Sequence, residues 1–123
     1  KLIDVDKALA MVESDTDIVV SLAAAEPYDF MSRLHEVADR VQNVNVLTCI
    51  NMGSYKFTTE PEMKGHFTNC AWFYTPIVRK SHEYGTASYI PNHLHIAARD
   101  RLHYRAPHIF IGSSAAMDKH GYF

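Results

Sequence analysis

Glu26 is a carboxylate in a position from which side chains often do chemistry. It follows an apolar run of strand length, Ile18–Leu22, and stands directly before Pro27, which opens the next helix. A carboxylate at the exit of a buried strand can orient a ligand or take part in proton transfer. The same group can instead stabilise the start of the helix, where the helix dipole favours negative charge. The sequence favours this second role and leaves the first open.

Arg79 and Lys80 form a second candidate group, because they stand near the start of an expected helix. Thr75 can cap this helix, Pro76 opens it and Gly85 ends it. Since the dipole disfavours cations near a helix N-terminus, the pair is a candidate contact for an anionic ligand group. Two solvated surface side chains are the simpler interpretation, and both alternatives stay open.

Histidines and serines offer weaker signals. His93 and His95, two of eight histidines, would share one face of a strand at a spacing that metal sites use. No second cluster with ligand spacing accompanies them, so ordinary hydrogen-bonded histidines are favoured. Ser113 and Ser114 follow an expected strand, but G-x-S-x-G is absent, as are G-x-G-x-x-G and the Walker loop. We therefore expect no metal and no cofactor.

Composition places these residues in one domain at most. The chain has 123 residues, of which 47% are hydrophobic, so it can bury a real core. The formal net charge is −2, and acids and bases are interspersed, which argues against nucleic-acid binding. Cys49 and Cys70 are isolated and read as free buried thiols of a reducing compartment. Without a signal-peptide pattern or an apolar run of about 20 residues, we expect a cytoplasmic protein and no membrane contact.

Strand and helix signals alternate along the chain. The continuous apolar runs 18–22, 44–50 and 107–112, together with 67–73 and a short strand ending at Pro91, predict strands. Amphipathic or capped segments predict helices from Asp4 to near Glu13, from Pro27 to Val41, and over 75–85. Segment 55–64 is polar and lacks a period, which predicts a surface excursion, and 92–101 is ambiguous between loop and helix. This alternation predicts an α/β fold with an open, mostly parallel, doubly wound sheet flanked by helices.

In such sheets, ligands bind beyond the carboxyl ends of the strands. Those ends fall in the loops 23–27, 51–54 and 113–120, which are rich in small residues that let a ligand approach backbone amides. The sequence therefore predicts one binding crevice formed by these three loops.

Several ordered motifs resemble the acetyl-CoA hydrolase/transferase family, which includes 4-hydroxybutyrate CoA-transferase. Its G-H-F, aromatic-pair, R-K/Q, E-G and Y-x-P pattern is matched here by Gly65-His66-Phe67, Ala71-Trp72-Phe73, Pro76, Val78-Arg79-Lys80, Gly85 and Ser88-Tyr89-Ile90-Pro91. Ala25-Glu26-Pro27 resembles the family's A-E-P turn, and Asp118-Lys119-His120-Gly121-Tyr122 resembles its D-x-x-G-[YF] loop. The sequence departs from the family at 114–117, where S-P-P is usual, and at 93–98, which lacks the usual acid and proline.

The resemblance implies a fold of the NagB/RpiA/CoA-transferase type, with two such domains in the full-length chain and a homodimer. Residues 1–123 would be part of the N-terminal domain, and the catalytic C-terminal domain would lie outside this chain. The family moves CoA between an acyl-CoA and a short-chain carboxylate, of the acetate, butyrate or 4-hydroxybutyrate class, through a glutamyl-CoA thioester. That glutamate belongs to the C-terminal domain, so no catalytic residue is expected here and this fragment alone should be inactive.

By the same resemblance, the three loops would supply part of the substrate pocket and face the chain's own C-terminal domain. The expected substrate-binding residues are Ala24, Ala25, Glu26, Pro27, Asn51, Met52, Gly53, Ser113, Ser114, His120 and Gly121, with Arg79 and Lys80 as anion contacts. CoA enters as a substrate rather than as a cofactor. An acetyl-CoA hydrolase of the same family, and a non-catalytic α/β module that binds a ligand or partner, remain as alternatives.

Overall fold

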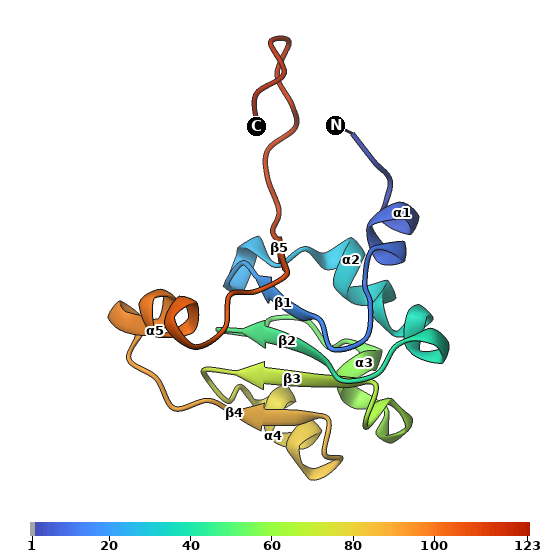
Figure 1. The fold of residues 1–123 in the computed structure, drawn as a ribbon, viewed down its shortest axis with the longest axis vertical. Helices are drawn as coiled ribbons and strands as arrows, with labels where there is room; N and C mark the ends of the chain where they lie inside the picture. The colour runs from blue at the N-terminus through green and yellow to red at the C-terminus, as the bar shows by residue number, and fades with distance from the viewer. Residues whose placement is uncertain (1) are drawn as a thin grey trace.

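A parallel β-sheet forms the centre of the computed structural model (Figure 1). The structure describes residues 2–123, apart from four side chains of one helix (98, 100, 102 and 104). Within these residues, the sheet has five strands in the order β4-β3-β2-β1-β5. The strands are β1 (Asp17–Val20), β2 (Val44–Thr48), β3 (Phe67–Ala71), β4 (Ala87–Tyr89) and β5 (Ile109–Ile111).

Every strand pairing is parallel. Ile18 of β1 lies opposite Val46 of β2 on one side and Ile109 of β5 on the other. The strands β1 to β4 follow one another across the sheet, and the chain then returns to place β5 beside β1. The order therefore reverses between β1 and β5, which is the switch point where open α/β sheets form their binding crevices. The predicted fold class, an open parallel α/β sheet, is confirmed.

Short helices connect the strands. They are α1 (Val5–Ala10), η1 (Ala23–Ala25), α2 (Tyr28–Arg33), η2 (Leu34–Arg40), α3 (Lys56–Thr59), η3 (Pro61–Met63), α4 (Pro76–Glu83), η4 (Leu94–Ile96) and α5 (Ala97–Tyr104), where η marks a 3-10 helix. As predicted, Asp4 caps α1 by accepting a hydrogen bond from Lys7 N at 2.8 Å. Thr75 caps α4, and Gly85 follows it with a φ of +75°. The single helix expected over 27–41 is instead α2 followed by η2.

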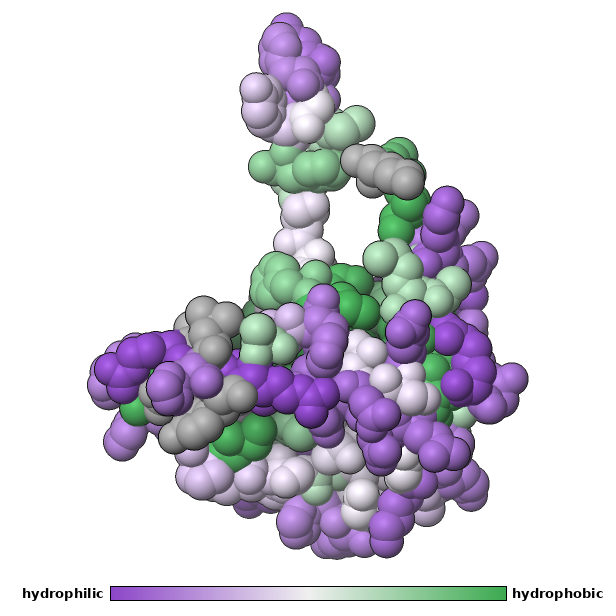
Figure 2. Space-filling model, viewed as in Figure 1, coloured by the Kyte–Doolittle hydropathy of each residue, from purple (hydrophilic) through white to green (hydrophobic). Residues whose placement is uncertain are grey.

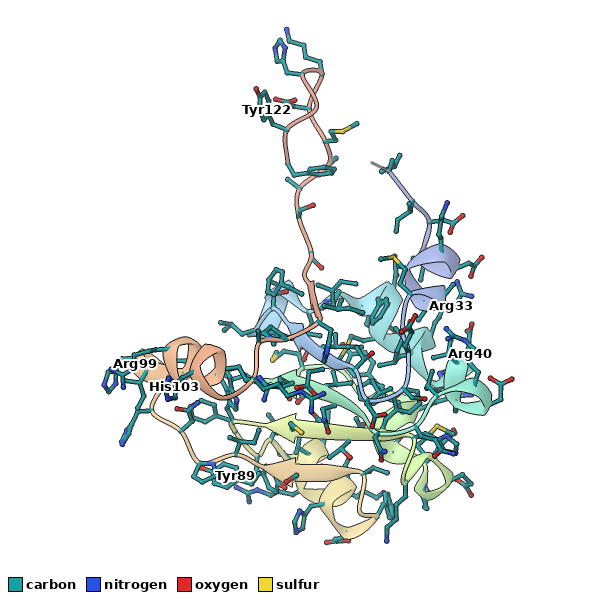
Figure 3. The ribbon with its side chains drawn as sticks, viewed as in Figure 1. Arg33, Arg40, Tyr89, Arg99, His103 and Tyr122 are labelled. Carbon is teal, nitrogen blue, oxygen red and sulfur yellow. The ribbon has the colours of Figure 1, made fainter. Side chains whose placement is uncertain are left out.

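The two faces of the sheet differ in character. Side chains that alternate along the strands, such as Ile18, Val46 and Phe67, are fully buried on one face against α1, α2, η2 and α3. Arg40 ties η2 to the end of α1, because its guanidinium donates to the carbonyls of Leu9 at 2.7 Å and Val12 at 2.6 Å (Figure 3). The opposite face is partly covered by α5. One face thus holds the hydrophobic core, and the other stays more open.

The expectation of a surface excursion over 55–64 was wrong. Tyr55 is 2% exposed and Phe57 is 0% exposed, and both belong to the main core. The Phe57 ring stacks on Tyr55 at 5.9 Å between centroids and meets Phe67 edge-on at the same separation. Because polar neighbours such as Lys56 face solvent, the sequence of this segment does not indicate that Tyr55 and Phe57 are buried. Segment 92–101, left ambiguous, forms η4 and the start of α5.

Phe57→Ala should therefore destabilise the fold strongly. Removing a fully buried phenylalanine costs about 3–5 kcal/mol, because apolar burial is lost and a cavity remains. Urea unfolding followed by circular dichroism measures the effect. Lys56→Ala, at the exposed neighbouring position, is the matched control and should change stability by less than about 0.5 kcal/mol. Similar costs for the two variants would contradict the burial of this segment.

Candidate functional site

The side chain of Glu26 is buried where the loops after β1 and β2 meet. It is 8% exposed. One carboxylate oxygen, Oε2, accepts hydrogen bonds from the Tyr55 hydroxyl at 2.7 Å, from Gly53 N at 3.1 Å and from Met52 N at 3.2 Å. Such bonds to an ionised group are stronger than those between neutral groups and offset the cost of burying the charge. Glu26 thus fixes the loop after β2 rather than the start of its own helix, which corrects the role favoured from the sequence.

The loop after β5 joins the same cluster. Ser113 Oγ donates to the carbonyl of Glu26 at 2.9 Å, and Ser113 N donates to the carbonyl of Ala25 at 3.1 Å. Ser21 N donates to the carbonyl of Ile111 at 3.0 Å, and Ser21 Oγ contacts the carbonyl of Ala25. Three loops that are far apart in the sequence therefore meet at the carboxyl ends of the strands, beside the switch point.

A cavity of about 300 Å³ opens at this place, between the first turn of α2 and the end of β5. We call it the strand-end crevice. Pro27 and Ser113, both predicted as binding residues, line it together with Tyr28, Asp29 and Gly112. An open hollow with backbone amides, a hydroxyl and an aromatic ring at its edge can hold a small polar ligand.

Two glycines allow the loops to approach each other. A Cβ at Gly53 would lie 2.4 Å from Cζ of the Tyr55 ring, and a Cβ at Gly112 would lie 2.7 Å from Ser21 Oγ. Real Cβ atoms do not come so close to ring carbons, so any side chain at residue 53 would displace Tyr55 from Glu26. Gly53 is therefore required by the packing around the crevice.

The remaining predicted residues of these loops occupy different environments. Asn51 is 3% exposed, and its side-chain oxygen accepts from Asn69 Nδ2 at 3.2 Å and lies 2.7 Å from Thr48 Oγ1. It thus belongs to a buried polar cluster rather than to the crevice wall. Ala24, Ala25 and Met52 are exposed in the loops that follow β1 and β2.

The end of the chain does not join the crevice. Beyond Ser113, residues 114–123 extend away from the body, with Tyr122 near the tip (Figure 3). There Asp118 Oδ1 accepts from His120 N at 2.8 Å and from Tyr122 N at 3.0 Å, and these backbone bonds lower the pKa of Asp118. The structure therefore places Ser114, His120 and Gly121 on an exposed segment, apart from Glu26.

Arg79 and Lys80 are exposed on α4. This helix packs near β3 and β4, toward the edge of the sheet opposite to the β5 edge. The structure does not bring them to the strand-end crevice. His93 and His95 have ring centroids 5.8 Å apart; His93 is the N-cap residue of η4 and His95 lies within it, so the two do not share the face of a strand. Among the described residues, no group of three or more His, Cys, Asp or Glu side chains could hold a metal ion.

Cys49 and Cys70 are free thiols, as the sequence indicates. Burial raises the pKa of Cys49, and burial with the nearby Asp17 charge raises the pKa of Cys70 to about 11. Both are therefore protonated at neutral pH and poor nucleophiles. No helix in the described part of the chain is long and apolar enough to cross a membrane.

The sequence did not reveal Tyr55 as a site residue. Its hydroxyl binds Glu26 across 29 positions of the chain, and no local pattern announces such a contact. Burial, and then the hydrogen bond to Glu26, raise the pKa of Tyr55. The only available signal was an aromatic residue shortly after the second buried strand.

Comparisons with known proteins agree with this geometry. The chain is 29% identical over 91 residues to 4-hydroxybutyrate coenzyme A transferase from Clostridium kluyveri, covering 74% of this chain and 21% of that protein. It superposes on RipA from Yersinia pestis with a TM-score of 0.84, at 21% identity, over 98% of this chain and 30% of RipA. A mutant of RipA gives a TM-score of 0.86 over the same shares. No family model matches the chain.

These likenesses define the class of fold and support a CoA-transferase-like domain. RipA shares the fold, and the Clostridium kluyveri transferase is a distant relative in sequence. The chain spans about a fifth of the transferase and less than a third of RipA.

Removing the Glu26 carboxylate should loosen the loops around the crevice. In Glu26→Ala, the buried hydroxyl of Tyr55 and the partly buried amides of Met52 and Gly53 lose their acceptor, and the free energy of unfolding should fall by roughly 3 kcal/mol. Glu26→Gln keeps one side-chain oxygen and should cost less. Chemical denaturation measures both variants against Glu62→Ala, which removes an exposed carboxylate. If the free energy of unfolding falls no more in Glu26→Ala than in this control, Glu26 does not hold the loop after β2 as assigned.

Stability at high pH should depend on Tyr55. Because its folded pKa is raised, its contribution to stability is fully present below the unfolded tyrosine pKa of about 10 and is lost as the pH rises through the folded value. The free energy of unfolding should therefore fall above about pH 10, and less steeply in Tyr55→Phe than in the parent. Parallel slopes for the two proteins would contradict this.

Proposed function

We propose that this chain is part of the N-terminal domain of a CoA-transferase that moves CoA between an acyl-CoA and a short-chain carboxylate. The observation that carries the proposal is the meeting of three loops at the switch point of the sheet. Glu26, in the A-E-P turn of the first loop, binds the second loop at Gly53 N and the third loop, after β5, at Ser113. The sequence similarity to a 4-hydroxybutyrate CoA-transferase supports it.

In the proposed reaction, the strand-end crevice holds the acyl or carboxylate end of the substrate. A glutamate supplied by a further domain attacks the acyl-CoA, which forms an acyl-glutamyl anhydride and releases CoA thiolate; the thiolate then attacks the glutamyl carbonyl, which forms the glutamyl-CoA thioester and releases the first carboxylate. The incoming acid attacks this thioester, and the same two steps in reverse give the new acyl-CoA and the free glutamate. The described residues contribute positioning: Glu26 and Tyr55 fix the loop at Gly53, and Ser113 ties in the third loop. A homodimer of the full-length protein in the cytoplasm completes the proposal.

The test uses the full gene product that contains this chain. We expect it to convert acetyl-CoA and butyrate into butyryl-CoA and acetate, measured by chromatography. Gly53→Ala should lower this exchange by about 100-fold, because a displaced Tyr55 ring shifts the crevice loops and small misplacements are costly to catalysis. Ser54→Ala, at the exposed next position, should leave the rate unchanged.

Borohydride trapping during turnover separates the alternatives. A covalent adduct that needs acyl-CoA supports transfer through a thioester. Release of CoA without any acceptor acid would indicate a hydrolase of the same kind. A full-length protein that yields neither adduct, exchange nor hydrolysis would refute the enzymatic proposal and favour a binding module.

A further inference from the structure

Two neighbouring imidazoles lie side by side without a hydrogen bond to the protein. In the part of the chain that the structure describes, the side chains of His93 and His95 contact each other, with ring centroids 5.8 Å apart, and form no hydrogen bond or ion pair. By contrast, His66 Nδ1 lies 2.8 Å from a backbone carbonyl, and His108 Nδ1 accepts from Asp17 N at 2.9 Å. The sequence favours hydrogen-bonded histidines, and this pair departs from that expectation.

The backbone that carries the pair is fixed at both ends. Before the pair, Ile90 N donates to the carbonyl of Ala71 at 2.9 Å, which attaches the chain to β3. Ile96 N donates to the carbonyl of His93 at 3.0 Å and closes the turn of η4. After the pair, Ala97 is 3% exposed and anchors the start of α5. Because the backbone is held, the two rings stay neighbours and lose little conformational freedom when they bind one ligand.

The separation of the two rings suits one shared metal ion. A bond between zinc and an imidazole nitrogen is about 2.0–2.1 Å long, which places the ion about 3.2 Å from the centre of the ring. Two rings on one ion therefore have centroids about 4.5 Å apart at a right angle, about 5.2 Å apart at the tetrahedral angle and about 6.4 Å apart when opposed. The observed 5.8 Å lies within this range. Small rotations of the two side chains are enough to reach any of these geometries.

The surface around the pair is open to ions from the solvent. Both side chains are exposed, and among the coloured atoms in Figure 2 the lobe of α5 and the residues before it shows mainly hydrophilic side chains. A hollow of about 380 Å³ adjoins His93 and is lined also by Tyr89, Asn92 and Ile96. An ion held by the two imidazoles can therefore complete its coordination with water, or with a donor atom of a small molecule in this hollow.

We propose that His93 and His95 together bind a divalent transition-metal ion. Imidazole nitrogen suits copper, nickel and zinc, and copper(II) is the most tightly bound of these in the general order of affinities. Two protein ligands leave coordination positions open, so the site exchanges its ion with solvent and does not hold the fold together. The site uses none of the residues around Glu26, and its failure would leave the proposed transferase activity untouched.

Titration with copper(II) tests the site on this chain produced without a histidine tag. Calorimetry should show one ion per chain bound more tightly than any further ion. Electron paramagnetic resonance at one equivalent of copper should show the nitrogen couplings of two imidazoles. Several ions of equal affinity would indicate adventitious binding by scattered histidines, and either that result or couplings from a single imidazole would overturn the proposal.

Single variants locate the bound ion. His93→Gln and His95→Gln each remove one ligand and should weaken copper binding at least about tenfold. His120→Gln removes an exposed histidine of the segment that extends away from the body, and as the matched control it should bind copper like the parent. Circular dichroism checks that each variant is folded. Parent-like affinity in His93→Gln or His95→Gln, or an equal loss in His120→Gln, would refute the site.

Discussion

The buried carboxylate of Glu26 is the interaction on which the arrangement of the crevice depends. A charge taken out of water is costly unless donors surround it, and here two backbone amides and a phenol all reach one oxygen. This requirement draws Tyr55 inward, and the Tyr55 ring in turn requires glycine at residue 53. One electrostatic constraint therefore sets the path of the loop after β2 and brings the α3 segment into the core.

The sheet uses its alternating faces for different purposes. On β1, Ile18 and Val20 point to the core, whereas Asp17 points to the other face. Burying Asp17 demands cations, and the chain supplies them from Arg101 and Arg105 on and after α5. These ion pairs hold α5 and the residue after it against this face of the sheet, beside the hollow that Leu47 and Trp72 line.

Local signals explain what the sequence could predict. Continuous apolar runs marked the buried strands, and caps such as Thr75 marked helix starts, because these patterns depend on neighbours only a few positions away. A crevice beyond the carboxyl ends of the strands could be predicted because strand and helix signals alternate along the chain, whereas the strand order, and with it the switch point, is seen only in the structure. Contacts between distant residues, such as Tyr55 with Glu26 and Arg101 with Asp17, carry no such pattern, because they exist only once the sheet has formed. The same limit hid the burial of Tyr55 and placed His120 at the crevice.

The motifs that carried the family resemblance turn out to serve the fold. Gly65 adopts a φ of +90°, Phe67 is fully buried, Pro76 opens α4 and Gly85 adopts a φ of +75°. Residues of this kind are required by backbone geometry and packing, whichever ligand the domain binds. They identify a shared architecture, which is why similarity at these positions supports the class of domain more firmly than its substrate.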